Sequence, residues 1–287
     1  MSTQLVYLNG EYLPLNEAKV SVLDRGFIFG DGVYEVIPAY AGNALRFDHH
    51  MQRLQNSLDA VRIDNPLSNE QWLEIVNKLI AETGKDDQSI YLHITRGVAS
   101  RDHQFPDEAK PTVFVMSNIL QPVNPELLKN GISAVTLDDF RWQHCNIKAI
   151  ALLPNILLRQ QAVDKDAMEA ILIRDGNMTE GAASNLFIVS NGIIKTPPKD
   201  NKLLPGITRD LVVELAKSHN MPVEEVIISE EEFFAAEEVW LTSSTKEIMA
   251  VTKINDQPVG NGKPGAAWHD IYQKYQDYKE TLRNNSF

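Results

Sequence analysis

The sequence predicts an α+β protein built of two unequal lobes. Runs of β-branched and aromatic residues, typical of strands, are interspersed with segments whose apolar residues recur at helical spacing. The length of 287 residues and the hydrophobic content of 43% allow two domains of roughly 100–200 residues each. A segment with two prolines and no periodicity, residues 118–125, predicts a linker. We expect a smaller domain at residues 1–119, a linker at 120–125 and a larger domain at 126–287.

The first lobe is expected to open with a β-hairpin over residues 5–14, because Asn9-Gly10 separates two short apolar runs. Three glycines then fall within seven residues, from Gly26 to Gly32. Such a density predicts a backbone that turns sharply or lies against another part of the chain, ahead of a strand.

Two helices are predicted next. Asp48 is expected to cap the first, and its apolar face comprises Met51, Leu54, Leu58 and Val61. Ser68-Asn-Glu-Gln71 has the capping-box pattern that opens the second, and Gly84 is expected to end it. The predicted buried face of the second helix comprises Trp72, Ile75, Val76, Leu79 and Ile80. Strand-like runs at 90–95 and 112–116 then enclose a polar loop at 96–111.

The second lobe is expected to mix both kinds of element. Strands are predicted at 131–136, 170–174, 186–190, 223–228 and 238–242, and helices at 155–163, 209–218 and 266–282. The stretch Met178-Thr-Glu-Gly-Ala-Ala-Ser-Asn185 is expected where one strand passes to the next, between tight turns. The acidic runs 230–232 and 237–238 are interpreted as solvated helix faces.

Composition excludes several classes of function. A net charge of −12 argues against a nucleic-acid partner, which clustered Lys and Arg would bind. No run approaches the roughly 20 apolar residues of a membrane span, and the start of the chain lacks a signal-peptide pattern. The single cysteine, Cys145, rules out an internal disulfide, so we expect a reducing, cytoplasmic setting. No metal site is predicted.

Four features suggest one kind of chemistry. Lys148 is a single amine within an apolar run, which would lower its pKa and make it nucleophilic. Glu180 lies among small residues, Gly206-Ile207-Thr208 opens a helix, and Ser243-Ser244 supplies hydroxyls after a strand. Amine, carboxylate, helix N-terminus and hydroxyls are what a phosphorylated pyridine aldehyde requires. Taken one at a time, Lys148 is as readily a lysine that reaches out of a strand, and Glu180 a solvated turn residue.

The order and spacing of these motifs, from Asp24 to about Ile254, resemble the class IV (fold type IV) pyridoxal-phosphate aminotransferases. The resemblance implies a small α/β domain, a larger domain with a barrel-like sheet, and pyridoxal 5′-phosphate held by Lys148 as a Schiff base. It places Glu180 at the pyridine nitrogen and Leu204 on the ring face. The groups that the resemblance assigns to the phosphate are Arg53, Gly206, Ile207, Thr208, Ser243 and Ser244, while Ser184 and Asn185 have only supporting roles.

Within that family, the first lobe resembles the D-amino acid transaminases most closely. The segments 30–36 and 95–106 carry the likeness, which makes Tyr34, Arg101 and His103 the group that holds the substrate α-carboxylate. Because the family supplies this group partly across a dimer interface, the resemblance implies a homodimer. Two departures, at 38–42 and at Ala182-Ala183, bear on substrate range or on hydrogen bonding to the ring.

The expected reaction is a ping-pong transamination between a D-amino acid of the D-alanine type and 2-oxoglutarate or pyruvate. Two relatives remain as alternatives: a branched-chain L-amino acid aminotransferase, which lacks the Arg-x-His loop, and an aminodeoxychorismate lyase, which keeps a motif like that at Arg96. A catalytically silent binding protein with the same fold is the alternative from another class.

Overall fold

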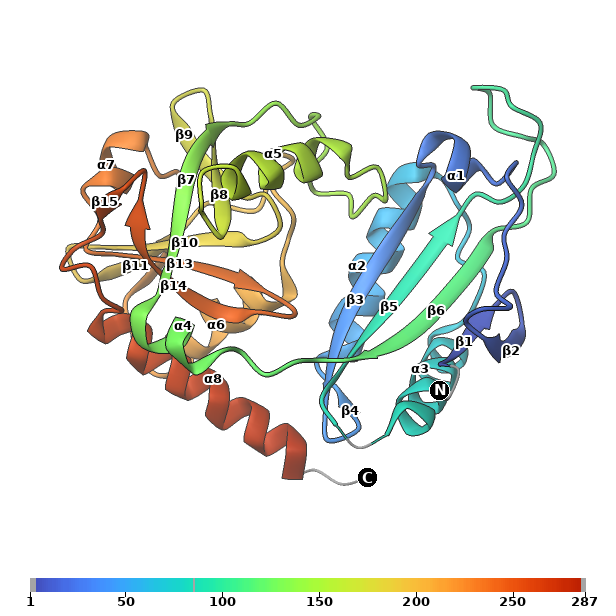
Figure 1. The fold of residues 1–287 in the computed structure, drawn as a ribbon, viewed down its shortest axis with the longest axis horizontal. Helices are drawn as coiled ribbons and strands as arrows, with labels where there is room; N and C mark the ends of the chain where they lie inside the picture. Colours follow the sequence, from blue (N-terminus) through green and yellow to red (C-terminus); the bar gives the residue numbers. More distant parts are fainter. Residues whose placement is uncertain (1–3, 85, 285–287) are drawn as a thin grey trace. The chain divides into compact units, whose positions relative to one another are not determined.

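The computed structural model describes residues 4–84 and 86–284, and they divide into two compact units (Figure 1). Unit 1 comprises the chain up to Gln121, the segment Ile147–Ala151 and the chain from Thr281 onward. Unit 2 comprises Pro122–Asn146 and Leu152–Glu280. The short segment that carries Lys148 therefore belongs to unit 1, although its neighbours in sequence belong to unit 2. The domain division predicted from the sequence, at residues 120–125, placed this segment in the larger domain.

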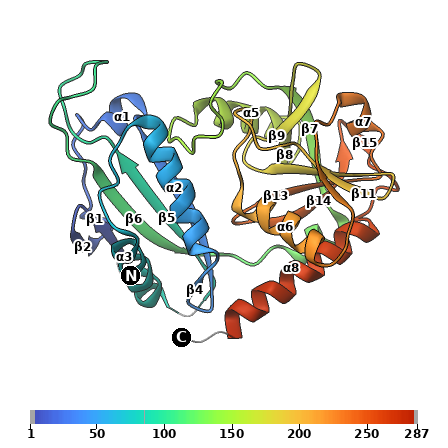
Figure 2. The same cartoon turned by 180° about the vertical axis from the view of Figure 1, so that it is seen from behind.

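Unit 1 is a six-stranded antiparallel sheet in the order β2-β1-β6-β5-β3-β4. Two helices, α2 and α3, cover one of its faces (Figure 2). The strands are β1 (Leu5–Leu8), β2 (Glu11–Pro14), β3 (Gly32–Tyr40), β4 (Asn43–Ala44), β5 (Gln88–Thr95) and β6 (Thr112–Ile119), and the helices are α1 (Arg25–Phe29), α2 (Phe47–Val61) and α3 (Asn69–Thr83). The predicted hairpin, both long helices and the strands on each side of the polar loop are confirmed.

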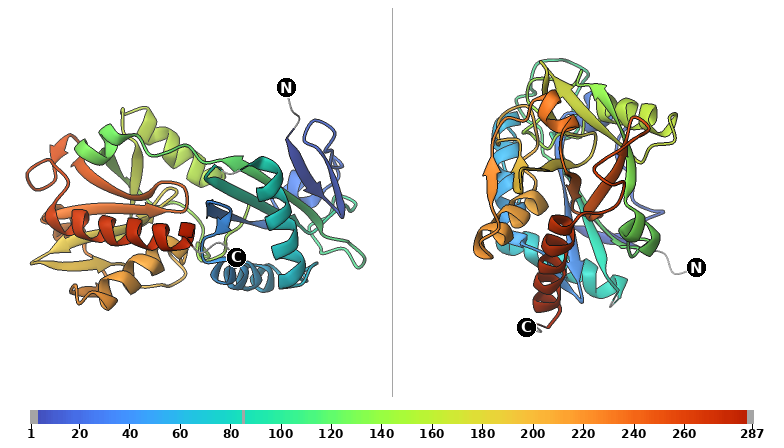
Figure 3. Two further views of the ribbon diagram at one scale, coloured as in Figure 1. Left: turned by 90° about the horizontal axis from the view of Figure 1, so that it is seen from below. Right: turned by 90° about the vertical axis from the view of Figure 1, so that its left-hand side faces the viewer.

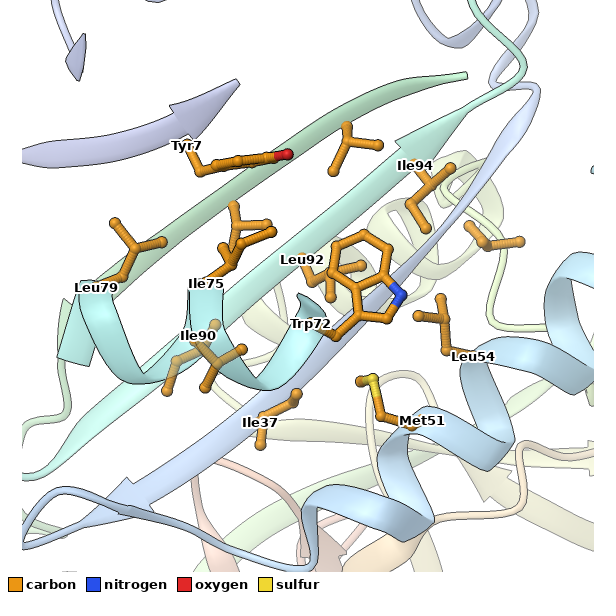
Figure 4. Close-up of a cluster of buried hydrophobic side chains, with 14 of the residues drawn as sticks. Tyr7, Ile37, Met51, Leu54, Trp72, Ile75, Leu79, Ile90, Leu92 and Ile94 are labelled. Carbon is orange, nitrogen blue, oxygen red and sulfur yellow. The ribbon is translucent and has the colours of Figure 1, made fainter. Parts of the chain in front are cut away.

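The core of unit 1 forms where the apolar stripes of the two long helices meet the sheet (Figure 4). Trp72 of α3 is fully buried there. The other four residues predicted for that helix face are also buried. Ser68 and Gln71 form the predicted capping box, and Gly84 ends the helix. The strands contribute Ile37, Ile90, Leu92 and Ile94 to the same cluster.

Two predictions for this unit were incomplete or wrong. Asp48 does not cap α2: the helix begins at Phe47 after Arg46, which has left-handed backbone angles, and Asp48 lies in the first turn. The short helix α1 was missed, because five residues with a glycine among them give no periodic signal. Asp24 caps its start with a side chain that accepts a bond from the Gly26 amide, and the left-handed Gly30 caps its end. A side chain at Gly26 would collide with Thr95 of β5, which confirms that the glycine-rich backbone lies against another strand.

Unit 2 contains a nine-stranded sheet in the order β12-β11-β10-β13-β14-β7-β8-β9, with β15 beside β14. The pairs β14/β7, β7/β8 and β11/β12 are parallel and the others antiparallel. Strands β9 and β10 are far apart in this order and are nevertheless in contact, so the sheet curls on itself and gives the barrel-like core that was predicted. The strands are β7 (Ile132–Asp138), β8 (Glu169–Arg174), β9 (Asn177–Gly181), β10 (Asn185–Ser190), β11 (Ile193–Thr196), β12 (Val223–Glu225), β13 (Glu238–Ser243), β14 (Glu247–Ile254) and β15 (Gln257–Pro258).

The helices of unit 2 include the three predicted by residue range, a short one at the acidic run 230–232 that confirms its interpretation as a helix face, and a short one that was not predicted. They are α4 (Pro125–Asn130), α5 (Leu153–Val163), α6 (Ile207–Ser218), α7 (Glu230–Phe234) and α8 (Ala266–Asn284), the last of which ends in unit 1. Strand β14 was also missed, and β12 is shorter than the predicted strand at 223–228. No helix in residues 4–84 and 86–284 is long and apolar enough to cross a membrane.

Glu238 corrects the interpretation of the acidic pair at 237–238 as a helix face. It lies in β13, and its carboxylate accepts bonds from the amides of Ala267 and Trp268 at 3.0 and 2.9 Å. These amides open α8, which runs along the curled sheet (Figure 3). A carboxylate at a helix N-terminus satisfies amides that have no partner within the helix. Glu238 therefore fixes the start of α8 on the sheet.

Candidate active site

In unit 1, Lys148 lies beside strand β3. Ala149 forms a bridge with Val33, the Tyr34 amide donates to the Lys148 carbonyl at 3.0 Å, and the Lys148 amide donates to Ser57 Oγ at 3.2 Å. Lys148 Nζ lies 4.3 Å from the centroid of the Tyr34 ring. Its side chain is half-buried. The fold thus brings together two predicted site residues that are more than a hundred positions apart in sequence.

Arg53, the predicted phosphate ligand on α2, is held by a buried glutamate of β3. Its Nε and Nη2 donate to the two carboxylate oxygens of Glu35, each at 2.8 Å. His50 Nδ1 lies 2.8 Å from the same carboxylate. Burial raises the pKa of Glu35, but the charge and hydrogen bonds of Arg53 and His50 outweigh it and hold that pKa far below its ordinary range. The guanidinium of Arg53 is therefore fixed in orientation.

Arg101 and His103 lie on the loop between β5 and β6, and both are exposed. The His103 ring is 5.4 Å from the ring of Phe29, and the Arg101 guanidinium is 5.5 Å from that ring. The structure therefore groups these two predicted residues around α1, on a different element from Lys148 and Tyr34.

In unit 2, Glu180 is a buried residue of β9. It was expected at a turn between strands, but it lies within a strand, and the turn is at residues 182–184. Its carboxylate accepts bonds from Arg141 Nη1 at 2.5 Å, from Asn185 Nδ2 at 3.1 Å and from the Leu204 amide at 3.1 Å. Burial raises the pKa of Glu180 to about 7, although Arg141 and the Leu204 amide act in the opposite direction.

Arg141 is a site residue that sequence reasoning missed. Asp139 holds it through two bonds of 2.9 Å, to Nε and Nη2, and a second arginine, Arg174, lies 2.9 Å from the same carboxylate. A sequence signal did exist: a glutamate in a segment between two apolar strand-like runs requires a counter-charge if it is buried. Asp139-Phe-Arg141 directly follows β7, which pairs with β8, the neighbour of β9.

The N-terminus of α6 lies beside this network. Its cap is Gly206, a residue with no side chain to bond the first amides of the helix. A side chain at Gly206 would collide with the amide group of Asn185, which also binds Glu180. Ile207 and Thr208 are buried in the first turn. A helix start without a capping side chain is suited to an anion.

Hydroxyl groups follow the end of β13. Ser243 and Ser244 are half-buried, and Ser243 Oγ accepts a bond from the Lys246 amide at 3.2 Å. Just before them, the hydroxyl of Thr242 is buried and makes no hydrogen bond within residues 4–84 and 86–284. In the same part of the chain, no group of three or more His, Cys, Asp and Glu side chains could hold a metal ion.

Comparison with known proteins identifies the family. The family model described as amino-transferase class IV matches residues 32–254, well over half of the chain. The chain belongs to the class IV aminotransferases. This class IV aminotransferase is 36% identical over 277 residues to the D-alanine aminotransferase of Staphylococcus haemolyticus, covering 96% of this chain and 98% of that one. It is 38% identical over 272 residues to the D-alanine aminotransferase of Bacillus licheniformis, covering 95% and 96%.

The solved structures with a similar fold include branched-chain amino acid aminotransferases. The branched-chain amino acid aminotransferase of Escherichia coli superposes with a TM-score of 0.91 at 26% identity, covering 100% of this chain and 98% of that one. The fold type IV architecture predicted from the sequence is thereby confirmed. The identity to the D-alanine aminotransferases is higher, at 36–38% over 95–96% of the chain, so sequence rather than fold separates these two groups of relatives.

Pyridoxal 5′-phosphate is the cofactor of this class IV aminotransferase family, and the residues present fit it. The ring nitrogen requires a carboxylate, and Glu180 is a buried one whose pKa is raised. The phosphate requires donors, and the uncapped start of α6 and the unbonded Thr242 hydroxyl are such groups. In unit 1, the buried His50 shares the Glu35 carboxylate with Arg53, and its Nε2 has no hydrogen-bond partner within the described chain.

Proposed function

We propose that this protein is a D-amino acid transaminase that transfers the amino group of a D-alanine-type amino acid to 2-oxoglutarate or pyruvate. The observation that carries the proposal is the 35–38% identity to D-alanine aminotransferases over nearly the whole chain. Pyridoxal 5′-phosphate supplies the aldehyde that takes up the amino group and the ring that withdraws electrons from the substrate Cα.

Lys148 is proposed as the residue that attaches the cofactor and then moves the proton of the substrate Cα. An amine tethered to that position is a suitable general base once it is released and uncharged. The aromatic face of Tyr34 and the strand contacts of the Ile147–Ala151 segment orient its side chain. Arg53, fixed by Glu35, is proposed to bind the phosphate.

Glu180 is proposed to hold a proton at the pyridine nitrogen. With a pKa of about 7, its carboxyl group accepts a hydrogen bond or a proton at little cost near neutral pH. Leu204, whose amide binds Glu180, is proposed to pack on the ring face. The phosphate is proposed to bind to donors from two elements: Gly206, Ile207, Thr208, Ser243 and Ser244.

The substrate carboxylate is proposed to bind to Tyr34, Arg101 and His103. A guanidinium forms two parallel, charge-assisted hydrogen bonds to a carboxylate. Every α-amino acid and 2-oxo acid carries such a carboxylate. We also propose a homodimer in which one protomer supplies Arg101 and His103 to its partner. Exposed apolar side chains support an interface: Phe27 is 73% exposed and Leu153 on α5 is 65% exposed. Light scattering at micromolar concentration should give twice the chain mass of 32.3 kDa.

We further propose that the protein works in the cytoplasm, because its one cysteine, Cys145, is a free and buried thiol. Fractionation of cells that produce it should recover the activity with cytoplasmic marker enzymes. Activity confined to an oxidising compartment would contradict this setting.

The deciding experiment offers the purified protein three substrates: the amino donors D-alanine and L-leucine, and aminodeoxychorismate, which a lyase would cleave without an acceptor. With 2-oxoglutarate as acceptor, D-alanine should yield pyruvate, and the other two should yield little ketoisocaproate or aminobenzoate. Turnover of L-leucine alone would support the branched-chain activity that the structural likeness suggests. No turnover of any of the three would indicate a binding protein.

The attachment of the cofactor is tested separately. Lys148→Ala should lose the visible absorption band of the lysine-bound cofactor and nearly all turnover, while its far-ultraviolet circular dichroism stays that of the parent protein. A Lys148→Ala protein that keeps the band would place the attachment on another amine.

A further inference from the structure

Unit 1 contains a second arginine–carboxylate network, centred on Asp31, that has no part in the roles assigned so far. Asp31 follows α1 and accepts bonds from Arg25 Nε at 2.8 Å and from Arg96 Nε and Nη2 at 2.8 and 2.9 Å. Burial raises the pKa of Asp31, but the bonds from Arg96 and Arg25 outweigh it and the pKa is lowered. The Arg25 side chain is only 4% exposed. A buried charge network is weak evidence for stability, and fixing one arrangement of the chain is its best-supported use.

Arg25 extends from this network to the loop between β5 and β6. Its Nη1 donates to the backbone carbonyl of Asp102 at 2.6 Å and to that of Gln104 at 3.3 Å. Asp102 separates Arg101 from His103, and Gln104 follows His103. One guanidinium group therefore closes the turn that presents the two residues proposed to bind the substrate carboxylate.

The same turn has an aromatic support. Phe29 lies one helical turn after Arg25 on α1, and its ring centroid is 4.8 Å from the Arg25 guanidinium. As described above, the Arg101 guanidinium and the His103 ring also lie against that ring. A single phenyl group thus contacts the positioning arginine and both proposed carboxylate ligands.

The second arginine bonded to Asp31, Arg96, contacts the loop after His103. The Arg96 guanidinium lies 3.7 Å from the Phe105 ring centroid, and Arg96 Nη1 donates to the Arg62 carbonyl at 2.8 Å. At the near end, the Arg25 amide donates to the Gly97 carbonyl at 2.9 Å. Asp31 therefore connects the two arginines that hold the loop before Arg101 and after His103.

This support matters because the loop has no helix or strand of its own and most of its side chains are exposed. Fixing a free residue in one backbone conformation costs entropy. If this cost were met only when substrate arrives, affinity for the carboxylate would fall by the same free energy. A loop that is already fixed presents Arg101 and His103 in the binding geometry beforehand.

We propose that Arg25 is a positioning residue for substrate recognition: through the backbone of Asp102 and Gln104, it holds Arg101 and His103 in the arrangement that binds the α-carboxylate. The inference rests on the proposed function, in which those two side chains bind that group. Arg25 touches neither substrate nor cofactor in this scheme and acts only through the loop.

The test is Arg25→Lys, which keeps a positive charge beside Asp31 but cannot bond Asp31 and two carbonyls at once. Michaelis constants for D-alanine and for 2-oxoglutarate should both rise by about tenfold to 100-fold, because both carry the carboxylate. The kcat should stay within about threefold, and the visible spectrum of the bound cofactor should not change. In the cofactor-free protein, amide hydrogen exchange at residues 99–105 should become faster.

Arg159→Lys is the matched control. Arg159 Nη1 donates to the Ala167 carbonyl at 3.3 Å in unit 2, so the change removes a comparable bond elsewhere and should leave both Michaelis constants unchanged. Phe29→Leu keeps Arg25 and removes only the aromatic support. It should raise both Michaelis constants by about threefold, and it provides a second measurement if Arg25→Lys fails to fold.

Arg101→Gln separates the two hypotheses. If it leaves the Michaelis constants unchanged, the proposed carboxylate site is wrong. If it raises them while Arg25→Lys changes neither these constants nor exchange at 99–105, the positioning role alone is wrong. A fall in kcat together with loss of the cofactor spectrum in Arg25→Lys would also contradict that role, because it would show a general structural effect.

Discussion

Glu35 in unit 1 and Glu180 in unit 2 are both buried glutamates bonded to an arginine, and the two have opposite properties. The pKa of Glu35 in unit 1 lies far below its ordinary range, whereas that of Glu180 in unit 2 is raised to about 7. Burial raises the pKa in both. The two pKa values differ because the charges and hydrogen bonds that lower the pKa against burial are not equivalent at the two carboxylates.

Glu35 receives both bonds that a guanidinium can give to a carboxylate, and His50 adds a third contact. Glu180 receives one bond from Arg141, whose other nitrogens are bound to Asp139. Asp139 also repels a negative charge on Glu180. A glutamate that accepts two bonds from one guanidinium is held as an anion. A glutamate that accepts one bond from an arginine also bonded to Asp139 keeps the ability to take a proton near neutral pH.

The largest expected effect concerns rate. Glu180→Gln should lower kcat for D-alanine and 2-oxoglutarate by about 100- to 1000-fold, because a preorganised charge at the reacting ring is lost. The free energy of unfolding of the cofactor-free protein should stay the same or rise, since a buried acid has been removed. Steady-state kinetics and urea denaturation measure the two quantities. A variant with unchanged kcat would mean that Glu180 is as structural as Glu35.

Glu35→Gln should have the opposite profile. Arg53 would remain buried without its carboxylate, and breaking such a pair costs about 3–5 kcal/mol in free energy of unfolding. Urea denaturation of the cofactor-free protein measures this directly, with Glu180→Gln as the matched control. A loss below about 1 kcal/mol would show that the Glu35 pair is not the anchor described here.

The pH dependence of stability should separate the two carboxyl groups. The pKa of Glu180 rises on folding from 4.5 to about 7, so the folded state binds a proton that the unfolded state releases, and this group makes stability fall as pH rises through that window by on the order of 3 kcal/mol. The pKa of Glu35 falls on folding, so its contribution is present above pH 4.5 and is lost below it.

Urea denaturation from pH 3 to pH 8 in the cofactor-free protein tests these signs. Glu180→Gln should remove the decline between pH 4.5 and 7, and Glu35→Gln should remove part of the loss in acid. If the wild-type protein and Glu180→Gln show the same pH dependence of stability between pH 4.5 and 7, Glu180 titrates at its ordinary pKa.

The smallest expected effect tests how Asp139 is held. Thr179 Oγ1 lies 3.2 Å from both Asp139 Oδ2 and the Leu172 carbonyl. Thr179→Val should reduce the free energy of unfolding by about 1 kcal/mol, the typical value of one hydrogen bond, and change kcat by less than about twofold. A larger change in kcat would show that Arg141 and Arg174 alone do not hold Asp139 in place, and that the position of Asp139 affects catalysis through Glu180.

Local patterns predicted much of the fold, because they depend on neighbours in sequence. The capping box at Ser68 and the apolar face of α3 needed only residues within a few positions. Asp48 was misassigned because several residues near a helix start can cap it, and Arg46 ends the preceding turn instead. Glu238 appeared to belong to an acidic helix face, since nothing local shows that α8 begins beside it, almost thirty residues later.

Among the candidate site residues, the sequence by itself marked those whose chemistry is unusual where they stand: an amine in an apolar run, a glutamate between strands, a glycine that opens a helix. Family resemblance then assigned their roles. The tertiary structure alone decided the partners. It returned the Lys148 segment to unit 1 and joined Arg25 to a loop about eighty residues away. It gave Glu35 two bonds from one arginine, and Glu180 a single bond from an arginine that also binds Asp139. Charge pairing depends on distances in space, and residue type and spacing along the chain do not contain those distances.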